Sequence, residues 1–413
     1  MKKVIGTEKI PIKMWLDDIE DGALEQALRL ANLPFAFKHV AIMPDAHQGY
    51  GMPIGGVLAT KGVIVPNAVG VDIGCGVIAV RTTLDKLGVD VIKQIMGDIR
   101  TLIPVGRNHH SVDQKEEYMP NIEDSTYYIN SYSMEDNLKR ELPIVGGEYK
   151  SALRQIGTLG GGNHFIEIQK GDDGRIWIMV HSGSRNIGYK VAKHYNALAY
   201  DLNTRWYSDT YLPKDKEQSL AFLPTDSKEG KLYIKEMQYC VDFALANRKL
   251  MMERLKHIFC NRIEDVFGGQ HGVEFDKEIN IPHNYATLEN HYGENVWVHR
   301  KGATKATLGL EGLIPGSQGT ASYIVKGLGA HESYYSCSHG AGRKMGRKDA
   351  KKKLKLSEEI EKLNKKGIVH GIRNTEDLDE ASGAYKDIDI VMANQADLVE
   401  ITTKLEPLAV VKG

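Results

Sequence analysis

The chain has 413 residues, of which 42% are hydrophobic and 26% charged, values that are ordinary for a globular protein. The 53 Lys and Arg residues nearly balance the 54 Asp and Glu residues, for a net charge of -1, which excludes a wholly basic nucleic-acid coat and an acidic solvating tail. Glycine is in excess at 42 residues, but there are only 13 prolines and no Gly-X-Y period, so collagen and disorder do not explain it.

Targeting signals are missing from the sequence pattern. The first residues include two lysines but no apolar segment of a secretory signal, and no run approaches the roughly 18 apolar residues of a membrane span. The four cysteines are scattered and form no CxxC motif, which fits a reducing compartment better than a disulfide framework. We therefore expect a cytoplasmic protein that does not associate with membranes, and we take it to be a monomer.

The predicted elements mix helices and strands without a regular βαβ alternation. Hydrophobic periodicity and the positions of glycine and proline predict helices at 23–32, 186–202, 232–259, 343–364 and 387–400, and the end of another helix at 151–156. They predict strands at 38–43 running into Pro44-Asp45, at 69–81 with a break, at 165–169, 176–180 and 405–411, and several more between 278 and 323. Residues 49–62 indicate a glycine-rich loop or bent strand, and 204–230 an excursion. No repeat or linker divides the chain, so we expect one α+β domain over 1–413, with mixed β-sheets surrounded by helices.

Six short segments place a polar or metal-binding residue at the end of an apolar strand. Glycines flank that residue in five of them, and glycine allows positive φ or a close approach to a ligand. Each signal is weak alone, but six together predict a shared site. The segments are MPDAHQGYG (43–51), GVDIGCG (70–76), GGGNHFIE (160–167), HSGSR (181–185), SHGAGR (338–343) and, without the glycines, EINIPHNY (278–285).

A metal centre is one interpretation of these segments. Asp72 and Cys75 lie three residues apart, and a cysteine thiolate can bridge two divalent ions, while His164, His181 and His283 each stand at a strand end. Imidazole, carboxylate and thiolate together suit a transition metal, although the affinity order would favour Zn²⁺ over Mn²⁺, so the residues do not name the metal. The alternative for Cys75 is a small buried hydrophobe, and that interpretation is preferred for Cys240 and Cys260.

Phosphate binding is a second interpretation. The sequence has neither a GxxxxGK[ST] motif nor a KxDG motif, which argues against a P-loop NTPase and a lysine-adenylate ligase. The loops 315–319 and 339–342 offer backbone N–H groups and small side chains that can surround a phosphate. Residues 343–355 hold eight Lys or Arg and one Asp, and we expect Arg343 and Arg347, four apart on one helix face, to bind phosphate. A solvated helix face is the alternative for the lysines.

Taken together with AYKDID (384–389), the six segments resemble the RtcB family of RNA-splicing ligases, and the resemblance extends from residue 11 to 413. It implies a GTP- and Mn²⁺-dependent enzyme. Such an enzyme joins an RNA 3′-phosphate or 2′,3′-cyclic phosphate to a 5′-hydroxyl. The reaction passes through a histidine-guanylate and an RNA 3′-pp-5′-G intermediate. The role would be tRNA splicing or RNA repair, and the need for an activating protein stays open.

The resemblance also implies a role for individual residues. Two Mn²⁺ ions would be held by Asp72, Cys75, His164, His181 and His283, with Cys75 shared between them. His339 would carry the guanylate with its ring oriented by Asp45, and Arg185, Arg343 and Arg347 would hold RNA phosphates. Guanosine and phosphate contacts would come from His283, His339 and the following residues: Asn163, His164, Phe165, Ile166, Glu167, Asn284, Pro315, Gly316, Ser317, Gln318, Ser322, Gly340, Ala341, Gly342 and Lys412.

Departures from the family pattern are few. Ala46 stands where Val is usual, Asn186 follows HSGSR where Gly is common, Pro282 precedes His283, and Gln48 and Tyr50 occupy variable positions. None of them removes a proposed ligand. Two other functions stay open, a two-metal phosphodiesterase without a covalent nucleotide and a non-catalytic RNA-binding protein. Lys412 and the SHGAGR loop favour nucleotidyl transfer, because a hydrolase needs neither.

Overall fold

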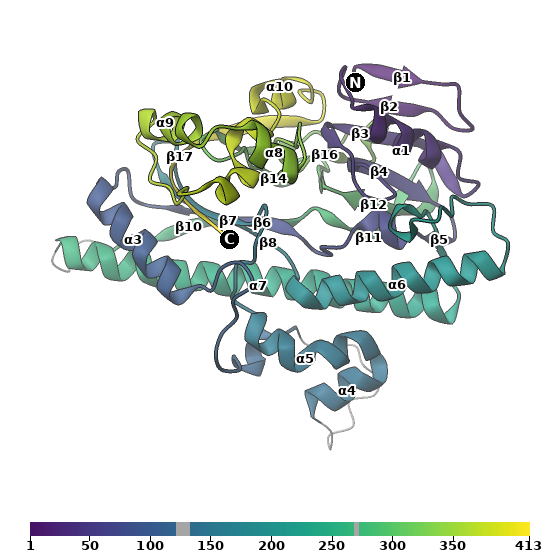
Figure 1. Ribbon diagram of the computed structural model, residues 1–413, viewed down its shortest axis with the longest axis horizontal. Coiled ribbons are helices and arrows are strands. Elements are labelled where there is room, and N and C mark those ends of the chain that lie inside the picture. The colour runs from purple at the N-terminus through teal and green to yellow at the C-terminus, as the bar shows by residue number, and fades with distance from the viewer. Residues whose placement is uncertain (121–132, 268–271) are drawn as a thin grey trace.

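Two large β-sheets form the centre of the molecule, with helices packed around them (Figure 1). The computed structural model describes residues 1–120, 133–267 and 272–413. This arrangement confirms the predicted class, a single large α+β domain with mixed sheets. In the part of the chain that is described, no helix is both long and apolar enough to cross a membrane.

The first sheet has six strands in the order β1-β2-β3-β4-β12-β11. Along β3, Val40 and Ile42 pack toward helix α1, while Ala41 and Met43 pack toward the C-terminal half of the chain. Asp45 continues the Ala41 and Met43 series, so its side chain enters the molecule from this sheet. The strands are β1 (Lys3–Ile5), β2 (Ile12–Met14), β3 (Ala36–His47), β4 (Ile54–Thr60), β11 (Asn284–His291) and β12 (Glu294–Lys301).

The second sheet has seven strands in the order β10-β6-β8-β7-β17-β15-β14. Ile78 and Val80 of β6 pack against α3 and α7, whereas Val77 and Ala79 join the opposite face. That face packs against itself because the sheet curls, and Lys277 of one outer strand forms an ion pair with Glu311 of the other, 2.5 Å apart. The strands are β6 (Gly76–Thr82), β7 (Phe165–Gly171), β8 (Ile176–Ser182), β10 (Phe275–Pro282), β14 (Glu311–Ile314), β15 (Ser322–Gly327) and β17 (Val399–Lys412).

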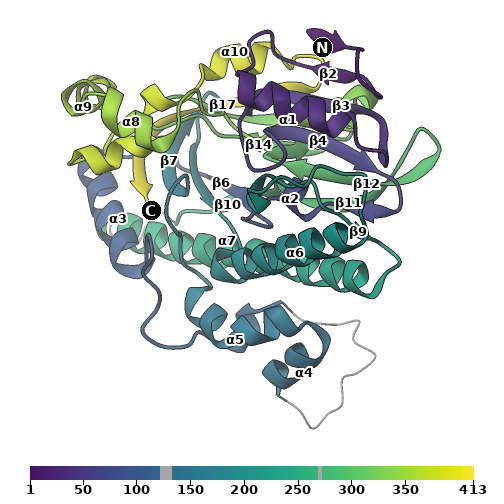
Figure 2. The ribbon, with the colours of Figure 1, turned by 45° about the vertical axis from the view of Figure 1, so that its right-hand side comes forward.

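The helices cover the outer surfaces of these sheets. α7 has 40 residues, about 60 Å of helix, and lies beside α6 along one face of the seven-stranded sheet (Figures 1 and 2). α4 and α5 pack beyond α6, and α8, α9 and α10 gather near β17. The helices are α1 (Asp21–Ala31), α2 (Pro66–Val69), α3 (Val89–Leu102), α4 (Met134–Glu141), α5 (Pro143–Gln155), α6 (Arg185–Arg205), α7 (Lys228–Phe267), α8 (Arg347–Lys353), α9 (Leu356–Lys365) and α10 (Ile388–Ala393).

Short elements connect this framework. Two ribbons of two strands each lie outside the large sheets, β5 with β9 and β13 with β16. The predicted excursion at 204–230 contains mostly loops, with η2, β9 and the start of α7. The remaining elements are β5 (Val63–Ile64), β9 (Leu223–Pro224), β13 (Ala303–Lys305), β16 (Ser336–Ser338), η1 (Glu116–Tyr118), η2 (Lys216–Gln218), η3 (His331–Ser333), η4 (Thr375–Glu380) and η5 (Ser382–Ala384).

Four sequence-based element predictions are wrong in extent. The basic helix expected at 343–364 is two helices, because the backbone is extended at Leu354, between α8 and α9. The helix expected at 387–400 ends at Ala393, and Gln395 instead holds Ser338 through its side chain, with Ser338 N donating to Oε1 at 2.9 Å. The long helix extends beyond 232–259 at both ends, and β17 begins at Val399 rather than at 405.

Gly74 is a position where backbone geometry fixes the residue type. Its φ is +74°, and a Cβ added there would lie 2.8 Å from Val241 Cα on α7. Gly309 is a matched control, because its φ is +78° and an added Cβ would meet nothing within 4 Å. Gly309→Ala should cost about 1 kcal/mol of unfolding free energy from φ alone, and Gly74→Ala should cost about 1–3 kcal/mol more from overpacking. Urea melts of the two variants would measure the difference, and equal midpoints would contradict the close approach to α7.

Candidate functional site

Strand pairing brings the predicted metal-binding residues together at one end of the curled sheet. Cys75 directly precedes β6, and Val77 of β6 pairs with His181 of β8. His181 also pairs with Phe165 of β7, which follows His164. His283 follows β10, and its backbone N–H donates to the carbonyl of Cys75 at 2.8 Å. Residues that are as much as 208 positions apart in the sequence thus lie on neighbouring strand ends.

These side chains form two overlapping groups that share Cys75. Cys75, His181 and His283 make one group, and Asp72, Cys75 and His164 the other, with the donor atoms of each group within 4.8 Å of one another. Cys75 Sγ lies 3.2 Å from His181 Nε2 and 3.5 Å from His164 Nε2. His181 Nε2 lies 3.3 Å from His283 Nε2, and Asp72 Oδ2 lies 3.1 Å from His164 Nε2. The shared cysteine matches the expected arrangement for two ions.

The electrostatics of this cluster also suit a cation. Burial lowers the pKa values of His181 and His283, which keeps both imidazoles neutral, the form that binds metals. His164 Nδ1 bonds to the carbonyl of Leu159 at 2.9 Å, which presents Nε2 to the cluster. Burial, followed by the charge of Asp72, raises the pKa of the Cys75 thiol, so a bound cation would be needed to hold it as a thiolate. The residues present therefore fit a metal centre.

His339 lies beside this cluster and is held by a buried carboxylate. Asp45 is fully buried on β3, and its Oδ2 accepts from the His339 backbone N–H at 3.0 Å and from ring Nδ1 at 2.6 Å. Gly342 has φ +71°, and a Cβ there would lie 2.1 Å from the Asp45 carbonyl, so this close approach requires glycine. The His339 ring centroid is 4.7 Å from that of His283. In the neutral ring, this bond places the proton on Nδ1 and the lone pair on Nε2.

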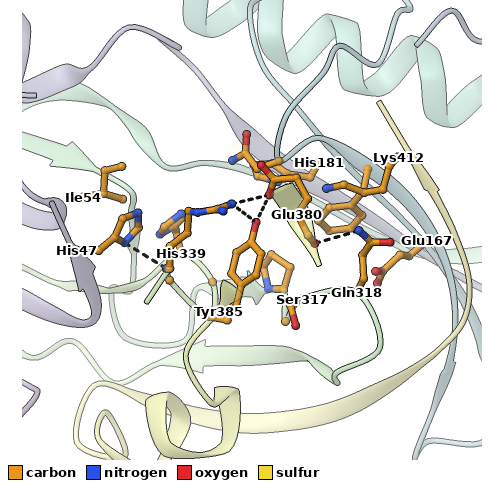
Figure 3. Close-up of a pocket in the computed structure, with 18 of the residues that line it drawn as sticks. His47, Ile54, Glu167, His181, Ser317, Gln318, His339, Glu380, Tyr385 and Lys412 are labelled. Carbon is orange, nitrogen blue, oxygen red and sulfur yellow. Dashed lines mark hydrogen bonds and ion pairs between the residues drawn. The ribbon is translucent and has the colours of Figure 1, made fainter. Parts of the chain in front are cut away.

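A pocket opens from His339 between β7, the end of β17 and the 315–318 loop (Figure 3). Phe165, Glu167 and Lys412 line it from the sheet, with the Lys412 Nζ 5.7 Å from the centre of the Phe165 ring. Burial raises the pKa of Glu167 to about 8 and lowers the pKa of Lys412. Gln318 donates to the Glu380 carbonyl at 3.0 Å, and its buried Oε1 has no hydrogen-bond partner in the described structure. This oxygen is therefore available to accept a hydrogen bond from a bound molecule.

Most of the residues expected to contact guanosine line this pocket, but five do not, and two of these, His164 and His283, belong to the metal-binding cluster. Ile166 points to the opposite face of β7 and packs in the core against α3 and α7. Ser322 is buried, where its hydroxyl accepts from Gly316 N at 3.2 Å and from Gln169 Nε2 at 3.0 Å. Asn284 lies in a neighbouring cavity, where its Nδ2 donates to the Asp72 carbonyl and its Oδ1 accepts from Gly302 N. The residues that line the pocket are Asn163, Phe165, Glu167, Pro315, Gly316, Ser317, Gln318, His339, Gly340, Ala341, Gly342 and Lys412.

The comparison with known proteins agrees with this geometry. A family model described as tRNA-splicing ligase RtcB matches residues 26–413. The chain belongs to the RtcB family. The RNA-splicing ligase RtcB of Escherichia coli K12 is 38% identical over 419 residues, which cover 100% of this chain and 99% of the relative. The tRNA-splicing ligases RtcB of Pyrobaculum aerophilum and Thermococcus kodakarensis are 33% and 32% identical, each covering 98% of this chain and 95% of the relative.

The arginine arrangement in this RtcB-family chain differs from the sequence-based expectation. Arg343 precedes α8 and Arg347 is its first residue, so the two do not share a helix face. Both bind Glu380 instead, with Arg343 NH1 2.9 Å from Oε2 and Arg347 Nε 2.7 Å from Oε1. The Glu380 side chain is 3% exposed and also accepts from the Tyr385 hydroxyl. Sequence reasoning assigned no role to Glu380 or Tyr385, although Tyr385 lies inside the quoted AYKDID segment.

The three arginines differ in their freedom to bind a ligand. Arg343 is 12% exposed and also donates to the Tyr385 hydroxyl and to the carbonyls of Met345 and Asp379. Arg347 is 49% exposed, and only its Nε is engaged by Glu380. Arg185 begins α6 with φ +58° and donates to Thr158 Oγ1 at 3.1 Å and to the Gly106 carbonyl at 3.0 Å.

Cobalt substitution can test the shared cysteine. Co²⁺ bound to a thiolate gives a strong charge-transfer absorbance, so wild-type protein titrated with Co²⁺ should show this band. Cys75→Ala should lose the band and weaken binding, because its Sγ lies in both donor groups. Cys240→Ala is the control, since Cys240 is buried in the separate core between α5, α6 and α7. A charge-transfer band of unchanged intensity in Cys75→Ala would contradict the assignment.

Proposed function

We propose that this protein is a GTP- and Mn²⁺-dependent RNA ligase that joins a 3′-phosphate or 2′,3′-cyclic phosphate end to a 5′-hydroxyl end. The observation that carries the proposal is His339, oriented by a buried carboxylate between a five-residue metal-binding cluster and a polar pocket. A two-metal hydrolase has no use for such a histidine. The E. coli, Pyrobaculum and Thermococcus relatives are named as RNA- or tRNA-splicing ligases, which supports the same substrate class.

His339 supplies the nucleophile in this proposal. Because Nδ1–H donates to Asp45, the lone pair of Nε2 can attack the α-phosphorus of GTP. A bond forms between Nε2 and phosphorus as the bond to pyrophosphate breaks. Asp45 then stabilises the positive charge that develops on the ring. The guanylate next passes to the RNA 3′-phosphate, which forms the 3′-pp-5′-G end and frees His339.

Guanine recognition follows from Glu167, Lys412 and Gln318. Guanine presents N1–H and N2–H₂ donors on one edge and O6 and N7 acceptors beside them. The Glu167 carboxyl group and the unpaired Gln318 Oε1 can accept hydrogen bonds, and the Lys412 amino group can donate one. Adenine reverses this pattern at N1 and N6. We therefore infer that the pocket selects GTP over ATP.

The metal cluster supports divalent-ion dependence. Asp72, Cys75, His164, His181 and His283 would hold two ions, and these ions would withdraw charge from the phosphate under attack. The mixed donor set is compatible with several transition metals, so Mn²⁺ is inferred from the family resemblance. A reduced Cys75 is required, which fits the cytoplasm. We infer further that the RNA ends are those of tRNA splicing or RNA repair.

Covalent labelling tests the nucleophile. Incubation with GTP labelled at the α-phosphate and Mn²⁺ should give a labelled protein band on a denaturing gel, stable to base and labile to acid. His339→Ala should lose the label completely, whereas His257→Ala, an exposed histidine on α7, should keep it. Persistence of the label in His339→Ala would place the nucleophile elsewhere. Opening of a 2′,3′-cyclic end with no labelled band would favour the hydrolase alternative.

The arginine geometry makes a second prediction. Arg347→Ala should slow RNA joining, leave self-guanylylation nearly unchanged and reduce the slope of log binding constant against log salt by about one unit. Arg343→Ala should instead lower the free energy of unfolding by about 3 kcal/mol, because it removes a buried partner of Glu380. Lys353→Ala is the control, since Lys353 is 65% exposed on α8. Equal effects of Arg347→Ala and Lys353→Ala on RNA joining would contradict a specific phosphate contact.

A further inference from the structure

A second cavity also reaches His339, and the scheme above gives a role only to its metal donors and to the residues that it shares with the first pocket. The two cavities share His47, Ile54, Asn163, His339, Arg343 and Arg347. Only the second one contains Asp72, Cys75, Asn284 and Lys301, whereas Phe165, Glu167 and Lys412 line only the first. His339 thus lines both cavities, and both touch the metal cluster, the first at His181 and the second at Asp72, Cys75 and His283.

The geometry of phosphoryl transfer gives the second cavity an occupant. In the joining step the 5′-hydroxyl oxygen forms a bond to the RNA 3′-phosphorus while the bond from that phosphorus to GMP breaks, and the hydroxyl proton is released to solvent. Attacking and leaving oxygens lie roughly in line on opposite sides of the phosphorus. Because the leaving GMP occupies the first pocket, the attacking strand must approach from the other side. The second cavity adjoins the first at His339 and does not include Phe165, Glu167 or Lys412, so it is the space that we assign to that strand.

The rim of this cavity carries the surface that a single-stranded RNA end needs. Tyr50 is 49% exposed and Val71 is 41% exposed, and both line the cavity. Arg347, half exposed, stands on the same rim with only its Nε engaged. An exposed aromatic ring stacks on a base of any identity, and an arginine binds the neighbouring phosphate.

Tyr50 is held in place by a buried lysine. Lys301 Nζ donates to the Tyr50 carbonyl and, at 2.9 Å, to the Asn67 carbonyl. Gln26, on α1, supports the same loop, where Nε2 donates to the Gly49 carbonyl at 2.6 Å and Oε1 accepts from Gly49 N at 3.1 Å. The backbone of Tyr50 is therefore fixed while half of its side chain faces solvent. A fixed backbone reduces the entropy lost when the side chain stacks on a base.

We propose that the second cavity binds the 5′-hydroxyl RNA strand and that the Tyr50 ring stacks on the first base of this strand. The proposal rests on the ligase function proposed above and adds the location of the second RNA substrate. Because stacking on a π-face does not depend on the identity of the base, the Tyr50 ring accepts any first base. It requires that a base be present, however.

A photocrosslink locates the strand without any catalytic step. A 5′-hydroxyl oligonucleotide with 5-iodouridine as its first nucleotide should crosslink to Tyr50 of the full-length protein, with or without GTP. Peptide mapping should find the crosslink within 48–52 in wild type, and Tyr50→Ala should lose it. A crosslink at Phe165, or none in wild type, would overturn the proposal. A crosslink at Tyr50 in a protein that never labels with GTP would leave the strand position standing and overturn the ligase function.

Kinetics then measure what the stack contributes. With a purified RNA 3′-pp-5′-G strand as the other substrate, Tyr50→Ala should raise the KM for the 5′-hydroxyl strand about tenfold, as expected for the loss of one base–aromatic stack. Self-guanylylation should not change, and Tyr50→Phe should behave as wild type. An abasic first nucleotide should raise the wild-type KM to the same extent and have no further effect on Tyr50→Ala.

The control for these kinetics is Tyr207→Ala, because Tyr207 is 95% exposed at the far end of α6 from Arg185. It removes an exposed tyrosine without approaching the cavity. An unchanged KM in Tyr50→Ala, or an abasic effect that adds to that of the variant, would overturn the stacking assignment.

Discussion

The hydrogen bond between Asp45 and His339 is the interaction on which the rest of the site depends. It joins the third strand of the first sheet to the residue after β16, and it sets the ring's tautomer at the same time. Burying a carboxylate costs free energy of solvation unless hydrogen bonds offset that loss. Here Oδ2 of the fully buried Asp45 accepts hydrogen bonds from both the backbone N–H and the ring N–H of His339. The hydrogen bond therefore fixes the His339 ring that lines both cavities of the site.

The two sheets contribute different parts of the chemistry. The curled second sheet carries the candidate metal donors Cys75, His164, His181 and His283 at or next to its strand ends, and it carries Phe165, Glu167 and Lys412 of the pocket. The first sheet carries Asp45 on β3 and Lys301 on β12, and the loop between β3 and β4 carries Tyr50. The active region therefore lies where two separately packed cores meet, the place where binding sites in large domains commonly form.

Much of the site could be predicted from the sequence because its chemistry is local. A candidate ligand such as Cys75 has glycines within two residues, so the segment can be recognised as a motif from the sequence. The six segments do lie close together in the structure. Glu380 could not be found in this way. Its two arginine partners lie 33 and 37 residues away, and nothing near it in the sequence marks a buried carboxylate. Periodicity likewise predicted that the helix continues beyond Ala393, where α10 ends. The sequence pattern does not show that Gln395 instead forms hydrogen bonds with Ser338, 57 residues earlier.

The long sequence separation of these contacts has a consequence for how the protein acquires its function. Cys75 meets His164 and His181 across 89 and 106 residues, and Asp45 meets His339 across 294. Contacts of this kind form only after large loops have closed, so the site belongs to the last stages of folding. A metal ion or nucleotide that binds only the native site would therefore stabilise the whole molecule by mass action.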